Sequence, residues 1–493
     1  MPGPRGALLV LQLLVAPASV TAGPPPAVAS PCTAIGEQKF AIILAEFPGI
    51  PFPYQFITPD QVFDLFQSTD KVSLDSVLRE QSSGRAWATS KMAGPFLLDR
   101  NYDRSREWPE GIQAALRAAE PYIDFREYNR VVVVWPVSGI SGFVGLSRVG
   151  CTEWTAPTQG KFTGSVITLH PGGQLPWETL VGLVSHEFGH CLGLAHAFSR
   201  DYSPLAVGPP GAAGRRTEYG DLFSVMGRTT SGGALHLAAP HKRRLGWLEN
   251  GADLAEVETS GSFRLEPLEG QATGLQAPRI RRPGSDQRLW LEYRQPIGQD
   301  QAIGGFAPSA FSGALVHLED AASSPEETDL LDFSPNTGGD FRDAALRTGA
   351  TWSDRYSLLA LRIDAATPRA LDVTVTYDTP CTTFSPAGRA HGHDTETGSI
   401  GVTAPGDCAW AVASTAPWLI VTSGENGRGN GTVTYVVGPN SGNAARAAAI
   451  YIARQRFAIT QDRLNYAPTG KGVTPGAGSV AAGRALRFEA QTS

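Results

Sequence analysis

The chain has 493 residues, with 41 Lys and Arg against 47 Asp and Glu, which gives a formal net charge of −6 at pH 7. This weak acidity argues against a nucleic-acid binder, which normally presents a basic stripe. The 55 Gly and 37 Pro fall below the share expected of a low-complexity chain, and 42% of the residues are hydrophobic, so disorder and a collagen-like structure are excluded. The length predicts about two to four domains.

Residues 1–22 have the pattern of a secretory signal peptide. Arg5 supplies a positive start, residues 7–15 are apolar, and small residues precede Gly23. The apolar run is shorter than the roughly 20 residues that a membrane-spanning helix needs. We therefore expect a secreted, extracellular protein of bacterial origin without a membrane span, in which a short segment over residues 23–37 precedes the first domain.

Strands and helices are mixed between residues 38 and 250. Thr58, Pro59 and Gln61 form the start signal of a helix, with a capping box and a proline at the first helical position. Apolar runs predict buried strands, and helical periodicity predicts two further helices. The predicted strands cover residues 39–45, 131–135 and 162–169, and the further helices cover 111–119 and 177–192.

Beyond Trp247 the pattern changes to short strand-like runs separated by turn residues, with almost no helical periodicity. This pattern predicts a β-sandwich accessory domain over residues 251–378. A further block of strands and turns covers residues 379–463. Residues 464–493 contain several Gly and Pro and are expected to form a linker or an incomplete C-terminal segment.

Three of the nine histidines fall within residues 186–196, in the pattern His-Glu-x-x-His-x-x-Gly-x-x-His. For this composition the pattern arises by chance with an expectation on the order of 10⁻⁵. His186 and His190 are four residues apart, so they project from one helix face and can bind one ion. Gly193 can take a left-handed conformation that ends the helix, and the turn then brings His196 back as a third ligand. Three protein ligands leave one tetrahedral position for water, which is typical of a catalytic zinc site.

Glu187 is adjacent to a ligand in sequence but points to a neighbouring part of the helix surface. Its carboxylate can therefore reach the water without coordinating the zinc, take a proton as general base and pass that proton to the leaving amine. The alternative is that the histidines of this helix are buried or hydrogen-bonded for structural reasons only.

The motif resembles that of the metzincin metallopeptidases, whose second mark is a methionine turn beneath the zinc. Met226 is the methionine downstream of the motif and matches that turn. Many metzincins with a tyrosine two residues after this methionine use it as an extra ligand. Arg228 holds that position here, so we expect no such tyrosine.

Within the metzincins the chain is most similar to the gametolysin-type peptidases. The matching stretches are residues 218–221, 225–227, 241–247, 291–295, 313–317 and 330–335. The resemblance implies a secreted endopeptidase that carries one catalytic Zn²⁺ and acts on extracellular or wall-associated proteins. The block over 379–463 resembles a BACON-type domain, which implies an immunoglobulin-like sandwich. The expected fold class is therefore an α+β metzincin-like catalytic domain followed by two all-β sandwich domains.

Five cysteines remain after the expected signal peptide, and an exported protein permits disulfides. Cys381 and Cys408 both lie in the last part of the chain and are the pair that we expect to be bonded. The pairing of Cys32, Cys151 and Cys191 stays open. A thiolate switch at Cys32 is an alternative to a disulfide there.

The sequence leads us to expect a zinc-dependent endopeptidase whose partner is a protein or glycoprotein substrate. An alternative is an extracellular carbohydrate- or mucin-binding adhesion protein with a vestigial zinc site. In that case Trp410 and Trp418 would be sugar-stacking platforms, although core packing also explains them. A third possibility is a zinc hydrolase for a bond other than the peptide bond. Structural Ca²⁺ is left open by the sequence.

Overall fold

The computed structural model describes residues 33–102, 107–136, 142–227, 233–271, 273–320, 323–337 and 340–464. The expected signal peptide, most of the segment over 23–37, Cys32, Arg228 and nearly all of the expected C-terminal segment lie outside these residues. The chain divides into two compact units, Met1–Pro380 and Cys381–Ser493, which are described separately. No helix in the described ranges is long and apolar enough to cross a membrane.

Unit 1 begins with a six-stranded sheet in the order β2-β1-β3-β6-β4, in which β5 also pairs with β6. The first four strands of that order are parallel, and β4 and β5 are antiparallel to β6. The strands are β1 (Gly36–Glu46), β2 (Ala86–Leu97), β3 (Arg130–Val134), β4 (Gly142–Ser147), β5 (Thr152–Ala156) and β6 (Gly160–Gly172).

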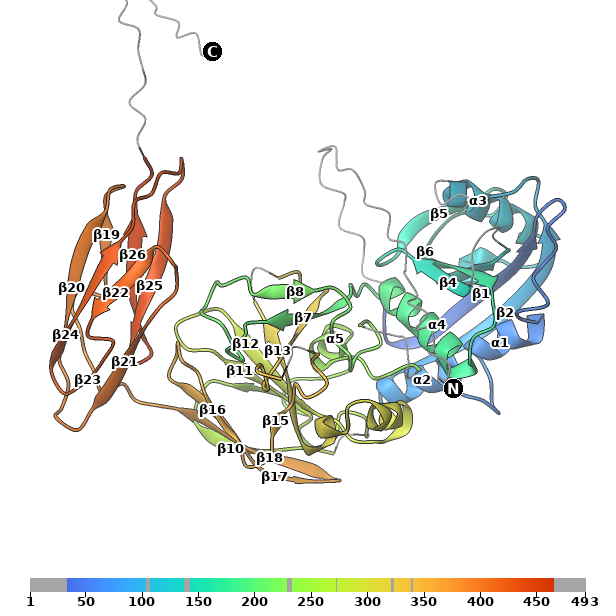
Figure 1. Cartoon of the computed structure of the whole chain (residues 1–493). Helices are drawn as coiled ribbons and strands as arrows, with labels where there is room; N and C mark the ends of the chain where they lie inside the picture. Colours follow the sequence, from blue (N-terminus) through green and yellow to red (C-terminus); the bar gives the residue numbers. More distant parts are fainter. Residues whose placement is uncertain are drawn as a thin grey trace, which may run out of the picture. The chain divides into compact units, whose positions relative to one another are not determined.

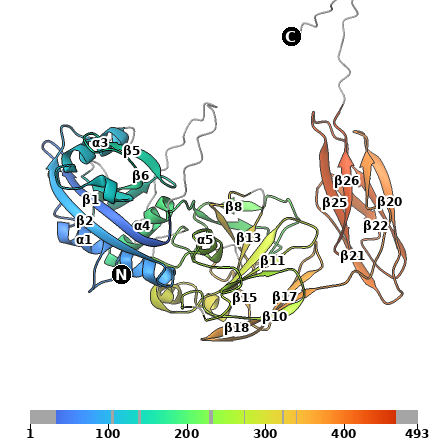
Figure 2. The same cartoon turned by 180° about the vertical axis from the view of Figure 1, so that it is seen from behind.

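Helices cover both faces of this sheet, as Figure 1 shows, and β1 is therefore buried on both sides. Phe40, Ile42 and Leu44 pack toward one group of helices, and Ala41 and Ile43 pack toward the other side. The first face carries α1 (Pro59–Phe66), α2 (Leu74–Gln81) and α4 (Trp177–Cys191), and the second carries α3 (Trp108–Ala119), with the short η2 (Phe125–Glu127). The view from behind in Figure 2 shows α3 and α4 on opposite sides of β1. The capping box predicted at Thr58 and Gln61 is present at the start of α1.

The rest of unit 1 is a sandwich of two sheets that share one hydrophobic core. The larger sheet contains β7 (Ala197–Asp201), β8 (Arg215–Thr217), β9 (Leu254–Val257), β11 (Ala277–Arg281), β12 (Arg288–Tyr293), β13 (Gly313–Glu319), β14 (Thr328–Leu331) and β15 (Leu346–Arg347). The smaller sheet contains β10 (Gly261–Leu265), β16 (Thr351–Ser353), β17 (Leu359–Thr367) and β18 (Ala370–Tyr377). Three short helices, α5 (Ala239–Arg244), η3 (Gly298–Gly305) and η4 (Pro308–Ser312), complete this part.

The larger sheet spans the residue at which the sequence pattern changes. Strand β7 follows the histidine motif directly and pairs in parallel with β14, which lies more than a hundred residues later. The segment that begins with His196 is therefore built into the same sheet as β12 and β13.

Unit 2 is a sandwich of a five-stranded and a three-stranded sheet around a core of aliphatic and aromatic side chains. Its strands are β19 (Gly388–His391), β20 (Glu396–Val402), β21 (Ala409–Ser414), β22 (Leu419–Ser423), β23 (Asn426–Arg428), β24 (Gly431–Val437), β25 (Arg446–Ile452) and β26 (Gln455–Gln461). The expected disulfide between Cys381 and Cys408 is present in this unit.

The expected fold class, an α+β metzincin-like domain followed by two all-β sandwich domains, is wrong. Within the described residues strands make up 40% and helices 16%, so this part of the chain is β-rich. The sequence patterns of the N-terminal part did not indicate β2, β4 or β5, and most residues of β2 and β5 are half-buried or exposed. The predicted helices are present as α1, α3 and α4, and α2 was not predicted, so the excess of β structure comes from strands that the sequence analysis missed.

Candidate metal centre

Helix α4 presents the first two histidines of the motif. Its buried residues run without a break from Leu180 to Cys191, because it packs against β4 and β6 and against α2. The helix ends at Gly193, which has a φ of +90°. The Gly193 N–H donates to His190 O at 2.8 Å and the Leu194 N–H donates to Gly189 O at 3.1 Å, which is the hydrogen-bond pattern of a Schellman motif. This turn directs the chain back so that His196 lies beside His186 and His190.

The three imidazoles form a compact donor group. One ring nitrogen from each of His186, His190 and His196 lies within 4.8 Å of the others. The ring centroids of His186 and His190 are 4.8 Å apart, and those of His190 and His196 are also 4.8 Å apart. This arrangement meets the first requirement of a metal site, which is convergence of the ligand atoms.

Each Nδ1 atom of the three histidines has a hydrogen-bond acceptor. His186 Nδ1 donates to Val225 O at 2.7 Å, His190 Nδ1 donates to Leu194 O at 2.8 Å, and His196 Nδ1 donates to the Glu218 carboxylate at 2.6 Å. Because these oxygens accept hydrogen bonds, the proton is on Nδ1 and each Nε2 lone pair is left available. The chemistry of the donor set therefore fits a metal ion held by three neutral imidazoles.

Burial keeps these imidazoles neutral. It lowers the pKa of His186 to about 3, with a smaller contribution from His190, and lowers the pKa of His190 to about 4. Burial also lowers the pKa of His196, although Glu218 acts in the opposite direction. At neutral pH the three rings are ready to bind a metal without first losing a proton.

Residues 218–226 form a segment beneath and beside the histidines. Val225 and Glu218 supply the acceptors for two of the rings, and the Ala197 N–H donates to Met226 O at 2.9 Å. Met226 is fully buried, and its Sδ would lie 2.2 Å from a Cβ built on Gly189. The thioether therefore packs directly against α4 at Gly189, whose lack of a side chain makes this close approach possible.

Glu187 is buried and is held by strand β4. The Ser147 hydroxyl donates to the Glu187 carboxylate at 2.9 Å, and its oxygen also lies 2.8 Å from Glu187 O. A Cβ on Gly145 would approach Glu187 Cγ to 2.7 Å, so a glycine is needed there. Burial raises the pKa of Glu187 to about 7, while the Ser147 hydrogen bond lowers it. A carboxyl group of this kind can accept and release a proton near neutral pH.

The structure also brings Tyr219 to the histidines, which the sequence analysis did not anticipate. Its ring centroid lies 3.8 Å from that of His196 and 5.9 Å from that of His186. Burial, and then the carboxylates of Glu218 and Glu187, raise the pKa of Tyr219, so the phenol is protonated at neutral pH. Tyr219 belongs to the stretch over 218–221 that matched the gametolysin-type peptidases. Nothing in the spacing of the sequence, however, indicated that its ring would lie over the histidine rings.

The remaining cysteines do not join this centre within the described residues. Cys191 is a buried free thiol that follows His190 in the chain, and Cys151 is disulfide-bonded. Burial raises the pKa of Cys191 to about 11, so this thiol is not ionised at neutral pH.

Trp410 and Trp418 of unit 2, for which the sequence left core packing and sugar stacking open, both pack against the core of that unit. Trp410 is buried in the core and its Nε1 donates to Gly429 O at 2.8 Å. Trp418 is partly buried, and the Arg446 guanidinium lies 4.1 Å from the centre of its ring. The buried Trp410 ring therefore offers no free face to a glycan.

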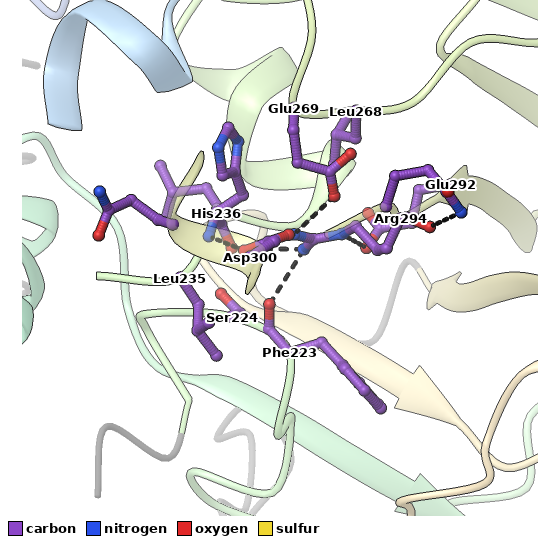
Figure 3. A network of polar contacts seen from close by, with 12 residues as sticks. Phe223, Ser224, Leu235, His236, Leu268, Glu269, Glu292, Arg294 and Asp300 are labelled. Atoms are coloured by element: carbon purple, nitrogen blue, oxygen red, sulfur yellow. Dashed lines mark hydrogen bonds and ion pairs between the residues drawn. The ribbon is translucent and has the colours of Figure 1, made fainter. Parts of the chain in front are cut away.

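A second group of polar side chains, shown in Figure 3, is buried next to the segment over 218–226. Arg294 is at its centre, and its guanidinium donates to Glu292 at 2.9 Å, to Phe223 O at 3.0 Å and to Asp300. Glu269 lies 3.9 Å from Arg294, and its carboxyl group also interacts with that of Asp300. The group holds the loop after Phe223 against β12.

Comparison with known proteins does not identify a family. The sequence matches no protein-family model, and it matches no curated protein. Fourteen chains of solved structures do match. Among them, a Bacteroides ovatus GH5 xyloglucanase in complex with a XXXG heptasaccharide has 13% identity and a TM-score of 0.16, over 17% of this chain and 19% of that chain. A protein from Bacteroides thetaiotaomicron has 12% identity and a TM-score of 0.14, over 18% and 92%. An ASH/PapD-like domain of human CEP192 has 12% identity and a TM-score of 0.15, over 18% and 91%. TM-scores this low carry no conclusion about fold or activity.

Proposed function

We propose that the protein is a secreted zinc-dependent endopeptidase that hydrolyses extracellular, cell-wall or mucin-type proteins. The observation that carries the proposal is the set of three convergent imidazoles, each with its Nδ1 proton hydrogen-bonded to an acceptor, together with the buried carboxylate of Glu187, the residue after His186 on the same helix. His186, His190 and His196 would hold the ion. Three nitrogen ligands from the protein are typical of a catalytic zinc rather than a structural one.

The chemistry divides between the ion and the protein. Zinc, when bound, would acidify a water molecule and polarise a carbonyl group. Glu187 would take one proton from the attacking water, whose oxygen forms the new bond to the carbonyl carbon. As the C–N bond breaks, Glu187 would return that proton to the leaving nitrogen, so that one product gains OH and the other gains H. Ser147 orients the Glu187 carboxylate for this exchange.

The test of the proposal is a cleavage-site profile of the full chain on a proteome-derived peptide library, with and without a zinc chelator. We expect cleavage that the chelator abolishes and that added Zn²⁺ restores. Glu187→Gln should lower the cleavage rate by about 10²- to 10⁴-fold while the zinc content stays near one ion per chain. Glu178→Gln is the matched control, because Glu178 is an exposed residue on the same helix.

Three outcomes would contradict the proposal. Cleavage by Glu187→Gln at the parent rate would exclude Glu187 as the base. A zinc-loaded protein that leaves the whole library intact but is retained on mucin or glycan columns would support an adhesion protein instead. A zinc-loaded protein that hydrolyses ester or amide compounds but no peptide would support a hydrolase of a different bond.

A further inference from the structure

Tyr219 lies over the imidazoles of the candidate metal centre. Its ring is 3.8 Å from the ring of His196 at an interplanar angle of 39°, and 5.9 Å from the ring of His186 at 25°. No strand or helix of unit 1 includes Tyr219, so its position depends on the two residues next to it in the chain.

The backbone at Tyr219 is held in an unusual conformation. Its φ is +59°, in the left-handed region that a residue with a side chain seldom occupies. On one side, the Glu218 carboxylate accepts a hydrogen bond from His196 Nδ1. On the other side, Gly220 fits so closely against Ser199 that a Cβ there would lie 2.1 Å from Ser199 Oγ, and the Gly220 N–H donates to Thr217 O at 3.1 Å. These contacts fix the ring over the site rather than leaving it free to turn away.

The hydroxyl of Tyr219 has no hydrogen-bond partner among the described residues. Several other tyrosine hydroxyls of the chain do have one: Tyr102 donates to Asp99 at 2.7 Å, Tyr202 to Ala212 O at 3.1 Å, and Tyr377 to Arg281 O at 2.7 Å. The Tyr219 hydroxyl is not among the buried unpaired atoms of the described residues, so it is open to solvent and free to donate to a bound ligand. Tyr219 is half-buried, and its ring contacts the donors of the site.

We infer that Tyr219 is a further catalytic residue, whose hydroxyl donates a hydrogen bond to the carbonyl oxygen of the scissile peptide as negative charge develops on that oxygen. This inference rests on the proposed endopeptidase function. It adds a protein hydrogen-bond donor to the scissile carbonyl oxygen, for which the proposed function has so far named no residue. A positioned donor of this kind strengthens its bond in the transition state, because the oxygen carries more charge there than in the substrate. The phenol donates without losing its proton, so no co-reactant is needed.

The test uses the zinc-loaded full chain and compares the wild-type protein with Tyr219→Phe, which keeps the ring and removes only the hydroxyl. The first readout is kinetic: we expect kcat to fall by about 10²- to 10³-fold with KM nearly unchanged. The second readout is binding: a phosphinic peptide, which presents a tetrahedral anion, should bind at least about tenfold more weakly to the variant. Acetohydroxamate, which chelates the metal without a tetrahedral centre, should bind both proteins equally, and zinc affinity should not change.

Tyr122→Phe is the control, because Tyr122 is 59% exposed and lies on the other side of unit 1's first sheet, next to α3. Equal binding of the phosphinic peptide to the wild-type protein and Tyr219→Phe would overturn the inference. A loss of zinc affinity in Tyr219→Phe would also overturn it, because the hydroxyl would then be supporting the ligands. If the wild-type protein binds zinc but cleaves no peptide, the proposed function fails, and the binding measurements alone still decide whether Tyr219 contacts a tetrahedral anion.

Discussion

His317 Nε2 lies 2.9 Å from Asp221 Oδ2, and neither side chain has any exposed surface. His317 belongs to β13, whereas Asp221 precedes Met226 by five residues in the segment beside the candidate metal centre. Asp221 also accepts a hydrogen bond from the Phe223 N–H at 2.9 Å. The pair therefore connects the large sheet of unit 1 to the turn that supports His186 and His196.

The first prediction concerns this pair. Asp221→Asn or His317→Gln should each lower the free energy of unfolding of unit 1 by about 3 kcal/mol, because each leaves a buried charged partner unsatisfied. The double variant should lose less than the sum of the two. Burial lowers the pKa of His317, but Glu292 and Asp221 outweigh burial and raise it above its ordinary value of 6.5. The coupling free energy between Asp221 and His317, obtained from the two single variants and the double variant, should therefore have its full value below pH 6.5. It should decline as the pH rises through the folded-state pKa of His317. A coupling free energy of zero at pH 6, measured by urea unfolding, would contradict this.

The second prediction concerns the Glu218 carboxylate at His196. Glu218→Gln keeps the shape but removes the charge that orients the ring and raises its basicity as a ligand. We expect a loss of about 10- to 100-fold in zinc affinity, measured by competition with a chromophoric chelator. Glu153→Gln, at an exposed ion pair with Lys161, is the control and should bind zinc like the wild type. If Glu218→Gln bound zinc as tightly as the control Glu153→Gln, Glu218 would not be orienting the His196 ring as a ligand.

The third prediction concerns the close approach of Gly189 and Met226. An alanine in a helix is normally about 1 kcal/mol more favourable than a glycine. Gly189→Ala should instead destabilise unit 1 by about 1–3 kcal/mol, because the buried Met226 thioether must move away from the new methyl group. Thermal unfolding with and without zinc measures this. Gly305→Ala, where nothing lies within 4 Å of the added Cβ, is the comparison. A stabilised Gly189→Ala protein would show that the contact is not tight.

The fourth prediction concerns Glu269 in the buried group of Figure 3. Burial, and then Asp300, raise its pKa well above the ordinary 4.5, although Arg294 acts in the opposite direction. The stabilising effect of the protonated form is fully present below pH 4.5 and is lost as the pH rises toward the folded-state pKa. Glu269→Gln cannot ionise, so its stability relative to the wild type should increase between pH 4 and pH 8. A difference that stays constant over this range would show that Glu269 is ionised in the fold.

The sequence was informative about the part of the site that lies within one turn of helix. The spacing of His186 and His190 and the glycine at 193 follow from helix geometry alone. Glu218 and Tyr219 could not be placed in the same way, because their position depends on the pairing of β7 with β14 and on the contact between Asp221 and His317. Those contacts join residues about a hundred positions apart, and periodicity carries no information about them.

The fold was less predictable than the site. Residues 40–45 of β1 are buried without a break because both faces of the sheet are covered, and this explains why the apolar run was readable in the sequence. Strand β2 is exposed or half-exposed over most of its length, so its sequence lacks a clear apolar pattern. Weakly patterned strands of this kind account for the error in fold class, because they add β structure that no local signal indicates.

The central claim is that the three histidines hold a metal ion that supports hydrolysis. The most direct measurement is a stepwise titration of the metal-free full chain with Zn²⁺, in which metal binding and peptide cleavage are followed in the same sample. We predict that both rise together and reach a plateau at one ion per chain, and that His190→Ala shows neither. Cleavage that is complete before any metal is added, or saturable binding at one ion per chain that persists in His190→Ala, would contradict the claim.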